Sequence, residues 1–426
     1  MEKSTKHKIA DIGKAPEGAK KIEWAWQYMP SLQFLENKYK ASQPFKGTTI
    51  AACLHLEAKT ACLLLTLTRL GATVAACGSN PLSTQDDICA ALAQGGVNVF
   101  SRRGMTTDEY FGYVRDVLAF EPNVIIDDGA DVVALVHKER QDLIPRIKGA
   151  SEETTTGVNR LKAMQADGVL KLPVISVNDA LSKYLFDNRY GTGQSVWDGV
   201  MRTTNMVVAG RTVVVAGYGW CGKGVAKRAA GLGARVVVTE IDPHKACEAL
   251  MDGFNVMPME EAAKVGDIFL TLTGNVNVID KRHFPLMKNG VIMGNAGHFD
   301  VEISKSDLAE LAVRVERLRD NVDTYIMKDG RRLNLLGEGR LANLACADGH
   351  PIEIMDLSFA LQLESALHVY THDMPPGIHA VPEETDRAVM ESKLAALGIQ
   401  IDVPTPKQTE YMKIWQESLP LPPMLA

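Results

Sequence analysis

The stretch GRTVVVAGYGWCGKGVAKRAAGLGARVVVTE, residues 210–240, decides the fold of this chain. Its β-branched run from Thr212 to Val215 predicts a buried parallel strand. Gly217, Gly219 and Gly222 then form the pattern G-x-G-x-x-G. The first glycine allows a tight turn, the second lets the backbone approach a pyrophosphate, and the third lets a helix pack closely on the strand.

A helix, a second strand and an acid complete this pattern. The helix expected over residues 223–232 would direct its N-terminal N–H groups at phosphates. The strand expected over residues 235–239 ends in Glu240. A carboxylate at that place accepts hydrogen bonds from ribose hydroxyls and repels a 2′-phosphate, so NAD is favoured over NADP. The stretch therefore predicts an NAD site, not a Rossmann unit without a nucleotide.

Size and composition narrow the function classes. A length of 426 residues predicts two or three domains, and 46% hydrophobic with 23% charged residues is ordinary for a soluble protein. A net charge of −6 without a basic block argues against nucleic acid. We expect no membrane partner and a cytoplasmic location, because no apolar leader or long apolar run is present. The seven cysteines include no CxxC pair, so buried reduced thiols are expected and a metal site is not.

Apolar runs alternate with helical patterns along most of the chain, which predicts an α/β fold. We expect two doubly wound, Rossmann-like parallel-sheet domains plus a short C-terminal tail. Residues 1–185, completed by 350–385, would form a substrate-binding domain, and residues 190–348 the NAD-binding domain. Residues 386–426 would be a C-terminal segment in contact with another subunit, and 357–370 an amphipathic helix.

Polar residues follow several predicted strands, where ligands of open parallel sheets bind. His55 comes directly after one strand and is followed by Glu57 and Lys59. These residues are either a buried structural histidine with a solvated ion pair at a helix start, or part of a site. The two interpretations stay open on these residues alone.

Two acidic segments come next. DDGAD, residues 127–131, places three carboxylates at a strand end, where they either bind a ligand or form an acidic turn that caps a helix. SEETTTG, residues 151–157, contains Glu153 among its carboxylates and hydroxyls. It either caps a helix through Ser151 or binds a polyol such as a ribose.

The segment SKYLFDNRYGTGQS, residues 182–195, places Lys183 and Asp187 on one face of a helix, if the helix persists. A lysine beside an acid at a domain junction suits proton transfer at a substrate hydroxyl. His298 and His350 lie in glycine-containing loops of the second half. They are either structural or acid–base groups near the transferred hydride.

Taken together, these motifs resemble the S-adenosyl-L-homocysteine hydrolase (adenosylhomocysteinase) family. The resemblance runs from about residue 20 to 415 and includes HLEAKTA, NPLSTQDD, DDGAD, SEETTTGVNRL, KYLFDNRYGTGQS, VVVAGYGWCGKGVA, TEIDP, NAGHFDVEI and GRLANLACADGHP. It implies an enzyme of the methyl cycle of one-carbon metabolism that hydrolyses S-adenosyl-L-homocysteine reversibly to adenosine and L-homocysteine. In that family tightly bound NAD oxidises the ribose 3′-hydroxyl, the C4′ proton and homocysteine leave, water adds, and the ketone is reduced. The resemblance also implies a homo-oligomer, specifically a homotetramer.

The resemblance also implies roles for individual residues. Lys183, with a pKa lowered toward neutrality, and Asp187 would manage the proton of the 3′-hydroxyl. Asp128 would take the C4′ proton, and His55 and His298 would serve the leaving thiolate and the incoming water. Glu153 would bind the ribose of the substrate, and Glu57, Lys59 and His350 would lie near its base or the hinge. NAD would be bound by Thr154, Thr155, Thr156, Asn188, Gly217, Gly219, Gly222, Glu240 and Asn343.

The chain departs from the family pattern in two places. Glu57-x-Lys59 stands where many relatives have Thr-x-Glu, facing the nucleobase. If Glu57 accepts from N1–H and Lys59 donates to O6, the substrate is S-inosyl-L-homocysteine, and a rearranged pair fits adenine equally. The C-terminal SLPLPPMLA lacks the Lys and Tyr with which many relatives reach a neighbouring subunit's cofactor. More remote alternatives are an ordinary NAD-dependent dehydrogenase and a non-catalytic regulatory relative.

Overall fold

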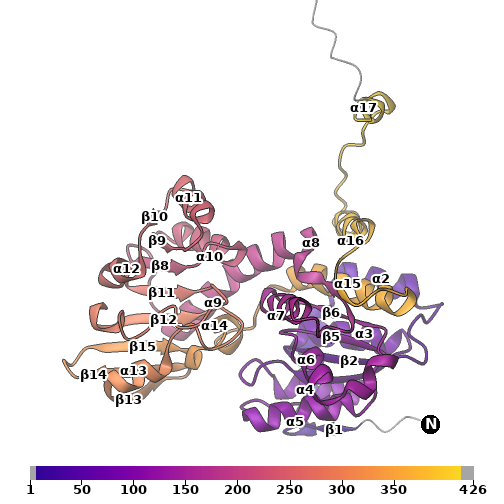
Figure 1. The fold of residues 1–426 in the computed structure, drawn as a ribbon, viewed down its shortest axis with the longest axis horizontal. Helices are drawn as coiled ribbons and strands as arrows, with labels where there is room; N and C mark the ends of the chain where they lie inside the picture. The colour runs from indigo at the N-terminus through magenta and orange to yellow at the C-terminus, as the bar shows by residue number, and fades with distance from the viewer. Residues whose placement is uncertain (1–5, 414–426) are drawn as a thin grey trace, which may run out of the picture.

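The computed structural model describes residues 6–413, which form two α/β lobes, each built on one eight-stranded sheet (Figure 1). In the first lobe all strands are parallel, in the order β1-β4-β3-β2-β5-β6-β7-β16. The strands are β1 (His7–Lys8), β2 (Thr49–Leu54), β3 (Thr73–Gly78), β4 (Asn98–Phe100), β5 (Val124–Asp127), β6 (Gly149–Glu152), β7 (Pro173–Ser176) and β16 (Gly377–Ala380).

Helices cover both faces of this first sheet, as the apolar character of its strands requires. In β2, Ile50 and Ala52 pack into one core with the helices of one face, while Ala51 and Cys53 pack into a second core on the other. The first face carries α1 (Ala15–Trp26), α2 (Pro30–Tyr39), α3 (Ala58–Arg69), α4 (Asp86–Gln94) and α15 (Ile352–Thr371). The second carries α5 (Thr107–Leu118), α6 (Asp131–Glu139) and α7 (Thr155–Ala166).

The second lobe contains the glycine-rich stretch. Its strand order is β10-β9-β8-β11-β12-β15-β14-β13, parallel except for the pairs that β14 makes with β15 and β13. The strands are β8 (Thr212–Ala216), β9 (Arg235–Thr239), β10 (Asn255–Val256), β11 (Ile268–Thr271), β12 (Val291–Asn295), β13 (Ala312–Arg319), β14 (Val322–Met327) and β15 (Arg332–Leu336). Its helices are α9 (Thr192–Thr204), α10 (Trp220–Gly231), α11 (Pro243–Met251), α12 (Met259–Val265), α13 (Lys305–Leu311) and α14 (Ala342–Ala345). The predicted α/β class with two doubly wound sheets is confirmed, and the antiparallel pairing at β13 and β14 is an addition to it.

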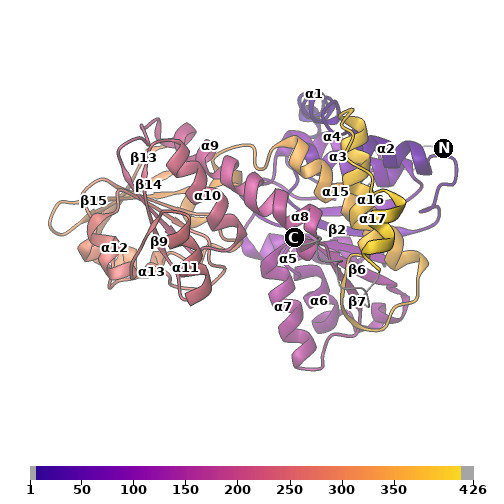
Figure 2. The same ribbon diagram turned by 90° about the horizontal axis from the view of Figure 1, so that it is seen from above.

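One helix runs from the first lobe into the second (Figure 2). It begins as α8 (Leu181–Lys183), widens into a π-helical segment (Tyr184–Gly191), and continues as α9. The chain returns through α15, and β16 then pairs with β7 at the edge of the first sheet.

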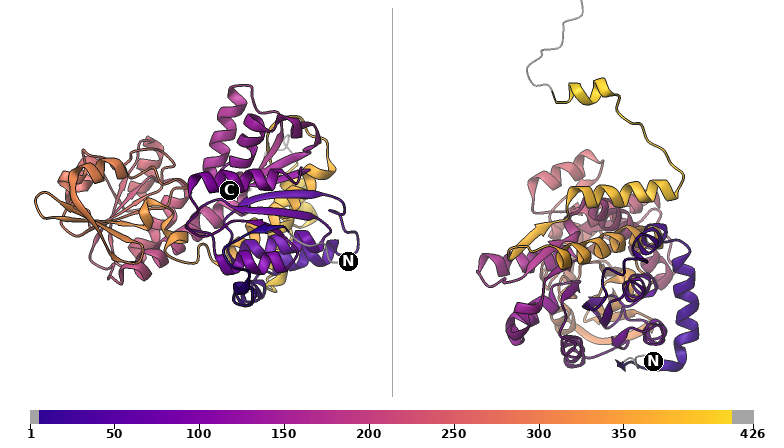
Figure 3. Two further views of the ribbon diagram at one scale, coloured as in Figure 1. Left: turned by 90° about the horizontal axis from the view of Figure 1, so that it is seen from below. Right: turned by 90° about the vertical axis from the view of Figure 1, so that its right-hand side faces the viewer.

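Helix α15 differs from the expected amphipathic helix. The consecutive residues 356–363 are all buried, because the helix lies between the first sheet and the helices α2 and α16 (Glu383–Ala396). Over residues 356–363 the helix therefore has no solvent face, and the polar residues Asp356, Ser358 and Gln362 are buried in the protein. Helix α17 (Pro406–Tyr411) stands away from the rest of the chain (Figure 3). The segment SLPLPPMLA lies outside the described residues.

No helix within residues 6–413 combines the length and the apolar composition needed to cross a membrane.

The close approach of α10 to the π-helical segment gives a test of this packing. A Cβ at Gly224 would overlap the carbonyl oxygen of Arg189, whereas a Cβ at Gly231, on the same helix, meets no atom of the described chain within 4 Å. We expect Gly224→Ala to lower the free energy of unfolding by about 1–3 kcal/mol through overpacking. Gly231→Ala should raise it by about 0.5 kcal/mol, because alanine is the better helix former. Urea unfolding measures both values, and equal effects of the two substitutions would contradict this packing.

Candidate active site

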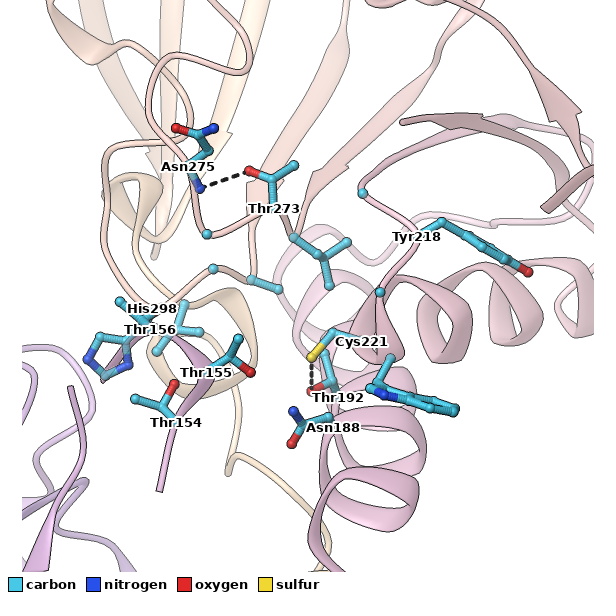
Figure 4. Close-up of a pocket in the computed structure, with 18 of the residues that line it drawn as sticks. Thr154, Thr155, Thr156, Asn188, Thr192, Tyr218, Cys221, Thr273, Asn275 and His298 are labelled. Carbon is cyan, nitrogen blue, oxygen red and sulfur yellow. Dashed lines mark hydrogen bonds between the residues drawn. The ribbon is translucent and has the colours of Figure 1, made fainter. Parts of the chain in front are cut away.

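A cavity of about 1570 Å³ is lined by residues of both lobes (Figure 4). It lies at the carboxyl ends of β2, β5, β8, β9, β11 and β12. Gly222 is the one predicted site residue that does not line it, and a Cβ there would overlap the carbonyl oxygen of Gly217. The cavity brings together the other candidates: His55, Glu57, Lys59, Asp128, Glu153, Thr154, Thr155, Thr156, Lys183, Asp187, Asn188, Gly217, Gly219, Glu240, His298, Asn343 and His350.

The glycine loop forms one wall of the cavity. Gly217 has φ of 95°, a backbone conformation that side chains disfavour, and a Cβ at Gly219 would meet no atom of the described residues within 4 Å. The loop therefore leaves room for a ligand to lie against its backbone, as a pyrophosphate requires. Glu240 braces this loop, since its carboxylate accepts the N–H groups of Tyr218 at 2.7 Å and Ile241 at 2.7 Å.

The three adjacent threonines lie opposite this loop (Figure 4). Thr154 is the N-cap residue of α7, and the hydroxyl of Thr155 donates to Asn178 Oδ1 at 3.2 Å. Thr156 approaches the second lobe, where a Cβ at Gly274 would lie 3.9 Å from its hydroxyl. These residues place hydroxyl groups where the two lobes meet.

Ser151 is not the N-cap that one interpretation expected. It lies in β6, fully buried, and its hydroxyl donates to Gln362 Oε1 at 2.6 Å. The helix begins four residues later, so the strand extends further than the pattern of SEETTTG suggested.

The three aspartates of DDGAD have three different environments. Asp127 accepts the N–H of Val133 at 3.0 Å in the first turn of α6, so the capping interpretation holds for this residue. Burial raises the pKa of Asp127 to about 7. Asp131 pairs with Arg160 at 2.7 Å. Only Asp128 lines the cavity.

Asp128 joins two histidines from different elements. Its Oδ2 lies 3.2 Å from Nε2 of His55, which follows β2, and its Oδ1 lies 3.7 Å from Nδ1 of His298, which follows β12. A Cβ at Gly129 would lie 2.6 Å from Nε2 of His298, so this histidine sits directly on the backbone of the first lobe. Burial lowers the pKa of His55 to about 4 despite the opposing charge of Asp128, so the imidazole is neutral near pH 7.

Two serines hold the other side of the His55 ring. Ser83 Oγ lies 2.7 Å and Ser79 Oγ lies 3.1 Å from Nδ1. Ser79 also lies 3.4 Å from Asp128 Oδ2. The serines, which we did not predict, fix the ring orientation and leave Nε2 toward Asp128.

The π-helical segment organises a second group around Lys183. The Nζ of Lys183 donates to Asn188 Oδ1 at 2.8 Å and lies 3.7 Å from Asp187 Oδ1 and 3.6 Å from Glu153 Oε1. In the wider π-helical turn the side chain closest to Lys183 is that of Asn188, five residues later. A regular α-helix would favour contact with the residue four positions later, which is Asp187. Asn178, at the carboxyl end of β7, also contacts this group and accepts from Asn188 Nδ2 at 3.1 Å.

The predicted fall in the pKa of Lys183, which combined burial with the charge of NAD⁺, does not arise from the protein's own residues. Burial alone would lower that pKa, but the carboxylates of Asp187 and Glu153 outweigh burial and raise it. The pKa of Asp187 shifts the other way, because Lys183 and His350 outweigh its burial and lower it. The His350 Nδ1 lies 2.8 Å from Asp187 Oδ1, and Ser358 donates to the other oxygen at 2.7 Å.

Two predicted residues present buried oxygens that accept no hydrogen bond, one of which, Glu153 Oε1, lies 3.6 Å from the Lys183 ammonium. Within residues 6–413, Glu153 Oε1 and Asn343 Oδ1 are buried without a hydrogen-bond partner. Glu153 Oε2 accepts from Gln362 Nε2 at 2.6 Å, and burial raises the pKa of Glu153 to about 8. Because buried polar atoms are usually satisfied, both unpaired atoms are suited to bind a ligand.

Glu57 and Lys59 form a buried pair, not a solvated one. Their side chains are 5% and 6% exposed, and Lys59 Nζ lies 2.7 Å from Glu57 Oε2. The Glu57 carboxylate also caps α3 by accepting the N–H groups of Lys59 and Thr60. The Lys59 ammonium donates to the carbonyl oxygen of Asp348 at 2.6 Å. Both side chains therefore offer a fixed acceptor and donor to the cavity.

Comparison of the sequence with known proteins shows the family to which the chain belongs. Residues 6–145 match the family model described as S-adenosyl-L-homocysteine hydrolase, and residues 188–349 match its NAD binding domain. The chain is 58% identical over 410 residues to adenosylhomocysteinase of Thermococcus kodakarensis, covering 96% of this chain and 97% of that protein. The chain belongs to the S-adenosyl-L-homocysteine hydrolase family.

Other members of this family carry two different names. The S-inosyl-L-homocysteine hydrolase of Methanothermobacter thermautotrophicus is 53% identical over 413 residues, covering 96% of this chain and 99% of that protein. The adenosylhomocysteinase of Thermotoga maritima is 52% identical over 401 residues, covering 94% and 99%. The protein is thus an enzyme with NAD as its cofactor, as the sequence predicted, and the purine of its substrate is a separate question.

The raised pKa of Glu153 predicts a change of stability with pH. In the folded protein the pKa of Glu153 is raised from its usual 4.5 to about 8. Its contribution to stability is therefore complete below about pH 4.5 and is lost as the pH rises through about 8. The free energy of unfolding of the wild-type protein should fall between about pH 5 and pH 8 as Glu153 becomes ionised. In Glu153→Gln this fall should be smaller than in the wild-type protein, because an amide resembles the protonated acid and does not ionise.

The matched control is Glu139→Gln on the surface, where Arg115 lowers the carboxyl pKa. This substitution should leave the slope in that window unchanged. Urea titrations at several pH values measure the slopes, and a wild-type slope in Glu153→Gln would show that Glu153 is ionised throughout.

Proposed function

We propose that the protein hydrolyses S-adenosyl-L-homocysteine reversibly to adenosine and L-homocysteine with NAD that stays bound. The observation that supports this most is that one cavity holds two separate groups of proton-handling side chains, centred on Lys183 and Asp128. A dehydrogenase needs one such group beside the transferred hydride. Elimination across C4′ and C5′ needs a second group of proton-handling side chains.

The glycine loop and the residues opposite it have the structure expected of an NAD site. The glycine loop has backbone without side chains at Gly219, and Asn343 offers a buried acceptor. We propose that these residues hold the cofactor together with Thr154, Thr155, Thr156, Asn188, Gly217 and Glu240. Gly222 would contribute by letting α10 pack closely on the loop. Bound NAD supplies reversible removal of a hydride from the 3′-carbon of the ribose.

The Lys183 group would act on the ribose hydroxyls. Glu153 binds them through its unpaired oxygen, and Lys183 and Asp187 exchange the 3′-hydroxyl proton. Because the pKa of Lys183 is raised, a base role requires a ligand that lowers it, and the positive charge of an oxidised nicotinamide has the required sign. His350 holds Asp187 in place at 2.8 Å.

The Asp128 group would act at C4′ and C5′. A 3′-ketone acidifies the C4′ hydrogen, which Asp128 removes as the carbon–sulfur bond to homocysteine breaks. His55 is neutral near pH 7, and His298 faces it at a ring-centroid distance of 6.0 Å. These imidazoles transfer protons between Asp128, the leaving thiolate and the water that adds to C5′.

We propose the following division of the chain. Residues 1–185, completed by 350–385, bind the substrate, and residues 190–348 bind NAD. Residues 386–426 contact another subunit in a homotetramer, which the exposed Val403, Tyr411 and Met412 support. A cytoplasmic location is supported by the seven free cysteines.

Loss of Lys183 tests the reaction. We expect Lys183→Ala to lower kcat by at least about 10²-fold, since a proton-transfer group is lost, while NAD remains bound. Wild-type protein should turn over without added NAD and without releasing reduced cofactor. Activity assays and the NAD content of the purified proteins measure both results. Wild-type turnover in Lys183→Ala, or stoichiometric release of reduced cofactor, would contradict the proposal.

A second candidate substrate is S-inosyl-L-homocysteine, and the Glu57–Lys59 pair is the observation that favours it. Hypoxanthine offers N1–H to the Glu57 carboxylate and O6 to the Lys59 ammonium. Adenine offers the opposite order, an acceptor at N1 and a donor at the 6-amino group. The same pair fits adenine only if Glu57 accepts from the amino group and Lys59 donates to N1.

The purine preference is measured as the ratio of kcat/KM for the two thioethers. We expect the double variant Glu57→Thr, Lys59→Glu to shift this ratio toward the adenosyl compound by about 10-fold or more, because an unpaired buried polar group costs about 1–3 kcal/mol. Threonine can still cap α3. Lys245→Asn, which changes a charge in the same cavity but on α11, should leave the ratio unchanged. An unchanged ratio in the double variant would show that these residues do not read the base.

A further inference from the structure

Asp386, on the C-terminal helix α16, caps the helix that carries Lys183. Its Oδ2 accepts the N–H of Leu181 at 2.9 Å, and its Oδ1 accepts the N–H of Ser182 at 3.0 Å. The hydroxyl of Ser182 in turn donates to the carbonyl oxygen of Asp386 at 3.1 Å. Figure 2 shows α8 and α16 side by side.

This cap replaces one that the local sequence does not supply. Ala180 is the N-cap residue of α8, and alanine has no side chain that accepts a hydrogen bond. The first N–H groups of a helix have no partner within it, and leaving them buried without one is costly. A carboxylate also interacts favourably with the positive end of the helix dipole.

Lys183 is the next residue after the two that Asp386 holds. Its ammonium contacts Asn188 at 2.8 Å, with Glu153 and Asp187 at 3.6 and 3.7 Å. These contacts need the backbone at residue 183 in one place, since a site loses efficiency when a side chain shifts by about 0.5 Å. The π-helical segment that follows begins at Tyr184 and supplies Asp187 and Asn188 to this group, so the start of α8 is the end of the helix at which Asp386 can act on the position of residue 183.

We propose that Asp386 is a positioning residue for Lys183, through which the C-terminal helix α16 sets the geometry of the proton-transfer group. This inference rests on the proposed role of Lys183. Asp386 does not line the cavity, so it acts through the helix and not on the substrate. It is 9% exposed, and its replacement therefore changes the helix start more than the protein surface.

The test compares Asp386→Ala and Asp386→Asn with Thr106→Ala in the NAD-loaded enzyme. Thr106 caps α5 through its own side chain, in the same lobe but on a helix without a predicted site residue. All three substitutions should lower Tm. We expect Asp386→Ala to lower kcat about 10-fold with a smaller change in KM, and to shift the pH profile of kcat, because the ammonium moves relative to Asp187 and Glu153. Asp386→Asn, which keeps one acceptor, should show a smaller change in the same direction.

Thr106→Ala should keep the wild-type kcat and pH profile when assayed well below its Tm. A wild-type kcat and pH profile in folded Asp386→Ala would overturn the positioning role. If Asp386→Ala does not fold, Asp386→Asn decides in the same way. Lys183→Ala separates the two proposals: wild-type turnover there rejects the role of Lys183 itself, whereas loss of turnover there with unchanged Asp386 variants rejects only the positioning role.

Discussion

The buried ammonium of Lys183 is the constraint on which the site depends. An isolated charge in this position would cost several kcal/mol, so partners must surround it. Asp187 supplies opposite charge, and Glu153 places an oxygen 3.6 Å from the ammonium. The other oxygens of these two acids are bound by Ser358 and Gln362 on α15. The helix that returns from the second lobe therefore completes the site begun by the first.

The junction between the lobes relies on close backbone contact. Gly193 in α9 and Gly224 in α10 face one another, and a Cβ at either would overlap backbone atoms of the facing segment. The helix that carries Lys183 is thereby pressed onto the helix that follows the glycine loop. The Lys183 group and the glycine loop thus lie on two helices in direct contact, which explains how residues of different lobes share one cavity.

Local patterns made much of this predictable. The glycine loop, its strands and Glu240 follow from one continuous stretch. The rule for parallel sheets places His55 and Asp128 at one edge of the first sheet and His298 at the carboxyl end of a strand of the second. The prediction failed where partners are distant in sequence. Ser151 belongs to a strand because β6 pairs with β5 and β7, and its hydroxyl bonds Gln362, far along the chain.

The direction of the Lys183 pKa shift has the same origin. Burial can be guessed from a sequence, but the shift depends on the distances to two carboxylates, which only the fold determines. The π-helical turn also leaves no simple signal in SKYLFDNRYG, whose pattern suits a regular helix. Asn178 could have been found, since it follows β7 as His55 follows β2.

The Glu57–Lys59 pair and the segment that returns from the second lobe are connected through Lys59. An ammonium has three N–H groups, and here Glu57 takes one and the carbonyl oxygen of Asp348 takes another. Asp348 lies on the segment that returns from the second lobe, two residues before His350, which holds Asp187. A purine that engages the third N–H would bond a residue already tied to that segment. The returning chain therefore contributes to both groups, through the Asp348 carbonyl oxygen at Lys59 and through His350 at Asp187.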